Sequence, residues 1–176
     1  MFEWIILLLA GLVLLAGVII YNRLVQDDHR VKSGWSDIEV QLKRRHDLIP
    51  KLVSAVKQYA AYETATLDAV ILLRSEAQQP NSVGDQASLE TGLTKSLISI
   101  YALQENYPDL KANQSFLQLQ TEITAVEGDI QFARRYYNGA VRNLNTRIDS
   151  FPDMLVANLF NYRQALYFEL EEAVVA

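Results

Sequence analysis

The feature that most constrains this chain is a stripe of apolar residues, spaced by three and four positions, that begins near Val31. This spacing places the apolar side chains on one side of an α-helix, which must then pack against partner helices. The stripe consists of Val31, Trp35, Ile38, Leu42, Ile49, Leu52, Val56 and Tyr59. Because the periodic pattern continues to about Ala77, it predicts helical structure over residues 31–77.

Two residues interrupt the stripe. Arg45 stands where an apolar residue is due, and Pro50 has no backbone N–H to donate within a helix. The stripe keeps its phase beyond Pro50, so we interpret Pro50 as a bend within one helix. The alternative is a new helix that Asp47 caps, with Pro50 in its first turn.

An uncharged apolar run from Trp4 to Tyr21 precedes the stripe. As a helix, its roughly 18 residues span about 27 Å, close to the thickness of the hydrocarbon core of a bilayer. Its aromatic ends suit the membrane–water interface. A cleaved signal peptide is the alternative, but the basic n-region of such a peptide is missing. We expect residues 1–22 to be a transmembrane anchor that contacts lipid through residues 4–21, and residues 23–176 to form a separate domain.

The charges that flank the apolar run predict its orientation. Arg23, Arg30 and Lys32 follow the run, and no Lys or Arg precedes it. Positively charged flanks stay on the cytoplasmic side of a membrane. We therefore expect a single-pass membrane protein with its N-terminus outside and its larger domain in the cytoplasm.

Composition narrows the class of the remaining chain. The 176 residues include no Cys, which excludes disulfides and thiolate metal sites. A net charge of −5 argues against a nucleic-acid-binding protein. Only seven Gly and four Pro occur, which favours long helices. The expected fold is all-α, with a single N-terminal transmembrane helix followed by an antiparallel bundle of three to four long helices with coiled-coil-like packing.

Turn and cap residues divide the bundle. A loop is expected over residues 78–85, followed by a second helix that Asp85 or Ser88 caps and that Tyr107-Pro108 closes. Asn113 is the expected cap of a third helix, which runs to Phe151 and carries a sustained seven-residue apolar repeat. The apolar and aromatic chain after Pro152 predicts a shorter packed helix.

No pattern of reactive side chains predicts catalysis. The two histidines are His29 and His46, and the positions three and four away from His46 are Leu42, Ile49 and Pro50 rather than metal ligands. No phosphate-binding glycine loop or nucleophile elbow occurs. We expect a protein that is not an enzyme, with no catalytic, metal-binding or cofactor-binding residues.

Charged residues on the helices predict structural ion pairs. A guanidinium in an apolar seam must be paired, so we expect Arg45 to meet an acid of the third helix, which offers Glu122, Glu127 and Asp129. In the same way, Arg134 and Arg135 are expected to meet Asp37 or Glu39 on the first helix.

The C-terminal segment predicts self-association. As a helix over residues 152–170 it would carry one apolar face of Phe151, Leu155, Leu159, Tyr162 and Leu166, and a second of Val156, Phe160 and Tyr167. In a monomer the second apolar face of such a helix would be exposed to water. We therefore expect a homo-oligomer that forms through Leu155, Val156, Leu159, Phe160 and Tyr167. The alternative is that the other helices cover both faces internally.

Several motifs resemble one known family. They include WSDIEVQLKRRHDLIPKLV (35–53), YPDLKAN (107–113), the A-R-R-x-Y-N-x-A-V-R pattern (133–142) and N-T-x-I-x-x-F-P (145–152). These motifs are similar to those of LemA family proteins, although residues 63–88 and the tail after residue 170 follow no such motif. The resemblance implies a bacterial-type membrane protein with one N-terminal span and a helical bundle. It also implies a link to membrane-associated processes, and it brings no catalytic residues.

Two functional hypotheses follow from these observations. The first is a non-catalytic, membrane-anchored scaffold or adaptor that recruits protein partners to a bacterial membrane or organises that membrane. The second is a ligand-sensing bundle that binds an acidic small molecule through Arg45, Arg134 and Arg135. The two differ in what the buried arginines contact: protein carboxylates in a scaffold, and an open cavity in a sensor.

Overall fold

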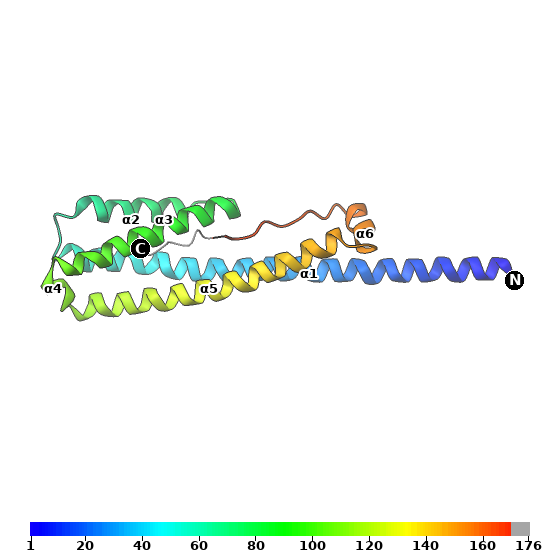
Figure 1. Ribbon diagram of the computed structural model, residues 1–176, viewed down its shortest axis with the longest axis horizontal. Coiled ribbons are helices and arrows are strands. Elements are labelled where there is room, and N and C mark those ends of the chain that lie inside the picture. Colours follow the sequence, from blue (N-terminus) through cyan, green and yellow to red (C-terminus); the bar gives the residue numbers. More distant parts are fainter. Residues whose placement is uncertain (170–176) are drawn as a thin grey trace. The chain divides into compact units, whose positions relative to one another are not determined.

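The computed structural model describes residues 1–169, and every regular element in this range is helical (Figure 1). The all-α class predicted from the sequence is therefore confirmed. The elements are α1 (Phe2–Lys57), α2 (Thr64–Ala77), α3 (Val83–Ala102), a 3₁₀ turn η1 (Leu103–Glu105), α4 (Pro108–Lys111), α5 (Gln114–Asp149) and α6 (Asp153–Leu159).

Helix α1 is 56 residues long and begins with the apolar run. It is the one helix among the described residues that is long and apolar enough to cross a membrane. Only 6% of its most apolar 18-residue window is buried, whereas the core helix of a soluble protein would be mostly buried. Trp4 and Leu12, for example, are 75% and 55% exposed.

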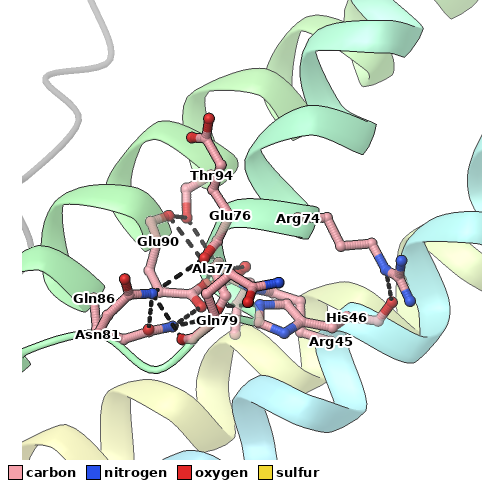
Figure 2. A network of polar contacts seen from close by, with 11 residues as sticks. Arg45, His46, Arg74, Glu76, Ala77, Gln79, Asn81, Gln86, Glu90 and Thr94 are labelled. Atoms are coloured by element: carbon pink, nitrogen blue, oxygen red, sulfur yellow. Dashed lines mark hydrogen bonds and ion pairs between the residues drawn. The ribbon is translucent and has the colours of Figure 1, made fainter.

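Helix α1 passes through Pro50 without a break. The interpretation of one continuous helix is therefore correct, and a new helix capped by Asp47 is not formed. Proline at position 50 leaves the carbonyl of His46, four residues earlier, without its helical N–H partner. Arg74 of α2 replaces that partner, because its Nε donates to the His46 carbonyl oxygen at 2.7 Å (Figure 2).

The helix expected over residues 31–77 is interrupted, which corrects the sequence interpretation. Helix α1 ends at Lys57, a turn follows, and α2 begins at Thr64. Side chains from distant parts of the chain contact this turn. The Tyr107 hydroxyl donates to Glu63 at 2.9 Å, and the Asn113 amide donates to the Tyr59 hydroxyl at 2.9 Å. Because these partners are distant in sequence, the local spacing of apolar residues does not predict the turn.

The caps of the next two long helices agree only in part with the sequence. Helix α3 is capped by Ser82, whose hydroxyl accepts from the Asp85 N–H at 3.2 Å, and not by Asp85 or Ser88. Helix α5 has the expected cap, because the Asn113 side chain accepts from the Phe116 N–H at 2.9 Å. The capping oxygens satisfy N–H groups that have no partner within the helix.

Helix α6 is much shorter than the helix expected after Pro152, and residues 162–169 have no helical structure. Asn161 follows the last turn with a φ of 57°, in the left-handed region that asparagine tolerates. The N–H groups of Asn161 and Tyr162 then donate to the carbonyls of Asn158 and Ala157, at 3.3 and 3.0 Å. This arrangement is a Schellman motif, which ends the helix.

The chain forms two compact units, to both of which α1 and α5 contribute. The first unit comprises residues 1–36 and 135–166, and the second comprises residues 37–134 and, of the described C-terminal residues, 167–169. In the first unit the Trp35 and Tyr137 rings lie 5.5 Å apart. Gly34 allows this close packing, since a Cβ added there would lie 3.1 Å from the Cα of Tyr137.

The second unit contains most of the buried apolar side chains and the candidate site. In it, α2 and α3 lie side by side (Figure 1). Most of its buried apolar residues come from the stripes of α1, α3 and α5, and they include Ile38, Leu42, Ile49, Leu52, Val56, Leu93, Leu97, Ile100, Phe116, Ile123, Val126 and Ile130.

Replacing Arg74 with methionine should destabilise the protein in a way that depends on Pro50. The substitution leaves the His46 carbonyl without a partner, so we expect the free energy of unfolding to fall by about 1–2 kcal/mol. In a Pro50→Ala background the alanine N–H supplies the missing donor, and the loss should be under about 1 kcal/mol. Denaturant unfolding of the four proteins measures both values. Equal losses in the two backgrounds would contradict the assignment.

Candidate functional site

The most deeply buried ionic group of the described chain lies between α1 and α3 in the second unit. The side chain of Glu90 is fully buried, and that of Arg45 is only 1% exposed. Both residues stand in apolar stripes: Arg45 follows Ile38 and Leu42 at helical spacing, and Glu90 precedes Leu93 and Leu97. The same packing that buries the stripes therefore forces the two opposite charges together.

Each oxygen of the Glu90 carboxylate has a donor. Oε2 accepts from Nη2 of Arg45. Oε1 accepts from the Gln86 amide at 2.7 Å, and it lies 2.9 Å from Nε2 of His46 (Figure 2). Three donors from two helices thus compensate the cost of taking this carboxylate out of water.

Arg45 has further partners on α3 and α5. Its Nη1 donates to the Glu127 carboxylate and to the Thr94 hydroxyl, the latter at 3.1 Å. The Thr94 hydroxyl in turn donates to the Glu90 carbonyl at 3.0 Å. One guanidinium therefore joins α1 to both α3 and α5. We refer to Arg45, His46, Gln86, Glu90, Thr94 and Glu127 as the Arg45 network.

His46 enters the Arg45 network as a neutral ring. Burial, together with the nearby cations Arg45 and Arg74, lowers the pKa of His46 from 6.5 to about 4, although Asp47 acts in the opposite direction. At neutral pH the ring therefore donates its Nε2–H to Glu90 and carries no charge.

Two polar atoms beside the Arg45 network have no hydrogen-bond partner among residues 1–169. They are Nε of Arg45 and the hydroxyl of Tyr101. Burial raises the pKa of Tyr101, and the Glu127 carboxylate raises it further. Tyr101 therefore remains a neutral phenol at physiological pH.

The acids expected on the third helix have different roles. Glu127 contacts Arg45, whereas Asp129 pairs with the neighbouring Arg44 at 3.3 Å on the surface. Glu122 accepts from the Gln118 amide at 2.9 Å. The position of an acid along α5 relative to the buried stripe decides which of these roles it takes.

The remaining arginines of the sequence hypothesis are less buried than Arg45. Arg134 is half-buried and Arg135 is exposed. Among residues 1–169, Arg134 forms no ion pair with Asp37, which is itself exposed.

The sequence reasoning missed Glu90, Gln86 and His46 as members of the Arg45 network. A signal for the first two was present, because Gln86 and Glu90 continue the spacing of Leu93 and Leu97 toward the start of α3. A polar residue in an apolar stripe signals a buried partner. It does not identify that partner, since the stripe describes only its own helix.

The residues proposed for self-association lie on two kinds of structure. Leu155 and Leu159 are exposed on α6, Phe160 is exposed directly after it, and Val156 is half-buried. Tyr167 is exposed in the non-helical segment. The expected helix with two apolar faces is therefore wrong, because α6 ends at Leu159. Self-association through these side chains stays a prediction.

The chemistry of the Arg45 network is structural. Its charged groups are occupied by one another, and residues 1–169 contain no group of three or more His, Cys, Asp or Glu side chains that could hold a metal ion. The arrangement fixes the relative positions of three helices.

Comparison with known proteins gives consistent matches. A family model described as the LemA family matches residues 34–176. The chain is 28% identical over 154 residues to Protein LemA of Metamycoplasma hominis, an alignment that covers 86% of this chain and 69% of that protein. It is 23% identical over 179 residues to Magnetosome protein MamQ 2 of Paramagnetospirillum magneticum, which covers 87% of this chain and 66% of that protein. The chain thus spans only about two thirds of the length of these relatives.

Removal of Arg45 should destabilise the protein far more than removal of its neighbour Arg44. Arg45→Ala leaves Glu90 buried without a countercharge, and we expect the free energy of unfolding to fall by about 3–5 kcal/mol. Arg44→Ala breaks an exposed pair with Asp129, and should cost under about 1 kcal/mol. Denaturant unfolding of full-length protein in detergent measures both. Similar small losses for the two variants would contradict the burial of Arg45.

The free energy of unfolding should decrease as the pH is lowered, because of His46. Below pH 6.5 the unfolded chain binds a proton at His46, whereas the folded chain does so only near pH 4. The free energy of unfolding should therefore decrease by about 2–3 kcal/mol as the pH falls through this window. His46→Gln keeps a donor for Glu90 and should remove this part of the slope. His29→Gln, at an exposed position, is the matched control and should retain it. If both variants keep the slope, His46 is not its source.

Proposed function

Because this chain belongs to the LemA family, we propose that it is a membrane-anchored helical scaffold or adaptor that recruits protein partners to a bacterial membrane. In this proposal the start of α1 spans the bilayer and the bundle faces the cytoplasm, as the basic residues Arg23, Arg30 and Lys32 favour. The proposed role is non-catalytic.

The observation that carries this proposal is the pairing of Arg45 with protein carboxylates. A sensor would keep a cation available for an incoming acidic ligand. Here Glu90 and Glu127 occupy both terminal nitrogens of Arg45, and the side chain is 1% exposed. A ligand would have to displace buried charges, at a cost of several kcal/mol for each ion. The geometry therefore favours the scaffold over the sensor.

The relatives support the membrane setting of the proposal. The names of the similar magnetosome proteins refer to magnetosomes. The exposed apolar start of α1 agrees with a place in a membrane. A rigid bundle held by a buried ion pair is suited to presenting a fixed surface to other proteins.

Crosslinking in native membranes tests the proposal. The full-length chain, a version whose residues 2–21 are replaced by an unrelated single membrane span, and residues 1–22 alone are each tagged and treated with an amine-reactive crosslinker. We expect the first two proteins to recover the same partner proteins and the anchor alone to recover none of them. The adaptor function is contradicted if the full-length chain recovers nothing beyond the anchor.

A further inference from the structure

Helix α6 and the residues that flank it expose more apolar surface than scattered surface residues do. Phe151 is 78% exposed, Leu155 58%, Leu159 77% and Phe160 54%. We refer to these four residues as the α6 patch. A cluster of large exposed apolar side chains marks a surface that contacts a membrane or another protein.

The end of the α6 patch contacts the end of the apolar run of α1. The rings of Tyr21 and Phe160 lie 4.6 Å apart. Tyr21 is the last residue of the uncharged run, at the position where interfacial aromatics occur in membrane spans. The α6 patch is therefore continuous with the surface of α1 that the proposed bilayer covers.

An ion-pair bridge fixes the other end of α6 against α1. Nε of Arg147 donates to the buried Asp27 at 2.6 Å, and its Nη1 donates to Asp153 at 3.0 Å. These contacts raise the pKa of Arg147, with the Asp27 hydrogen bond as the main cause, so the guanidinium stays charged. The first residue of α6 is thereby held at the level of Asp27.

The two contacts set the depth of α6. Tyr21 and Asp27 are separated by about 9 Å along the axis of α1. The headgroup layer on each side of a bilayer is about 5–8 Å thick beyond the hydrocarbon core. With Tyr21 at the edge of the core, Phe160 lies at that edge, within the depth at which interfacial amphipathic segments lie, and the start of α6 near Asp27 lies at the outer boundary of the headgroup layer.

The charges near the α6 patch suit anionic lipid. Arg23 and Arg163 are exposed and form no ion pair with any residue from 1 to 169. The acids Asp27 and Asp153 are paired with Arg30 and Arg147, and Asp28 is paired with Lys32 at 2.7 Å. Asp149, two residues before Phe151, is exposed and accepts from the Gln164 amide. The two free arginines outnumber this one acid, and a net positive charge attracts anionic headgroups.

We propose that the α6 patch inserts into the bilayer interface beside the N-terminal span, as a second lipid contact of this protein. This inference rests on the proposed membrane span. The occupant is the lipid headgroup and upper acyl-chain region, and not a second copy of the chain. The Arg147 bridge holds α6 in place, Leu159 and Phe160 enter the edge of the acyl-chain region, and Leu155 and Phe151 contact the headgroups.

Single cysteines in this cysteine-free chain test the proposal. Leu159→Cys and Phe151→Cys probe the patch, and Leu12→Cys probes the span. Ser33→Cys is the control, because Ser33 is exposed on α1 about 18 Å beyond Tyr21. Each variant carries an environment-sensitive fluorophore and is reconstituted in phosphatidylcholine–phosphatidylglycerol vesicles. Parallel vesicles contain lipids spin-labelled near the headgroup or deep in the acyl chain.

The expected pattern has three parts. Deep spin labels quench the fluorophore at position 12. Shallow spin labels quench it at positions 159 and 151 at least about twofold more than at position 33. The quenching is independent of the protein-to-lipid ratio.

Each alternative outcome overturns the inference for a different reason. If position 12 is not quenched, the proposed membrane span itself fails. If position 12 is quenched but positions 159 and 151 are quenched no more than position 33, the span stands and the α6 patch lies outside the lipid. If positions 159 and 151 become shielded only at high protein density, a second copy covers the patch.

Discussion

The second unit depends on the burial of one ion pair, between Arg45 and Glu90. A carboxylate that is fully out of water destabilises a fold unless its donors are in place, so α1 and α3 can pack in only one register. Gln86 and His46 donate to the other oxygen of the Glu90 carboxylate, and Glu127 joins α5 to the Arg45 guanidinium. The surrounding leucine and isoleucine stripes supply most of the burial, but these polar contacts specify how the stripes align.

The Arg45 network is also connected to the continuity of α1. Pro50 leaves the His46 carbonyl without a helical donor, and Arg74 of α2 supplies one. The side chain of the same His46 donates to Glu90. His46 therefore contacts Arg74 through its backbone carbonyl and the buried Glu90 carboxylate through its side chain. This arrangement lets α1 continue through Pro50 to Lys57 within the second unit.

The first unit contains the apolar start of α1 and the short helix α6, which exposes the apolar α6 patch. Arg147 bridges Asp27 and Asp153, and the Tyr21–Phe160 contact places the end of α6 at the end of the uncharged run. The proposed lipid contact of α6 would limit rotation of the attached helices about the membrane span.

The sequence by itself determined the helical class, the apolar run, the Asn113 cap and the need of Arg45 for a partner, because each of these is a property of one helix and its solvent. Only the tertiary structure decided that Glu90 is the buried partner of Arg45. It also decided that α1 ends at Lys57 rather than continuing. These features depend on Tyr107, Asn113 and α3, which are distant in sequence. Periodicity shows which face of a helix is buried, but the choice of partner is made by long-range packing.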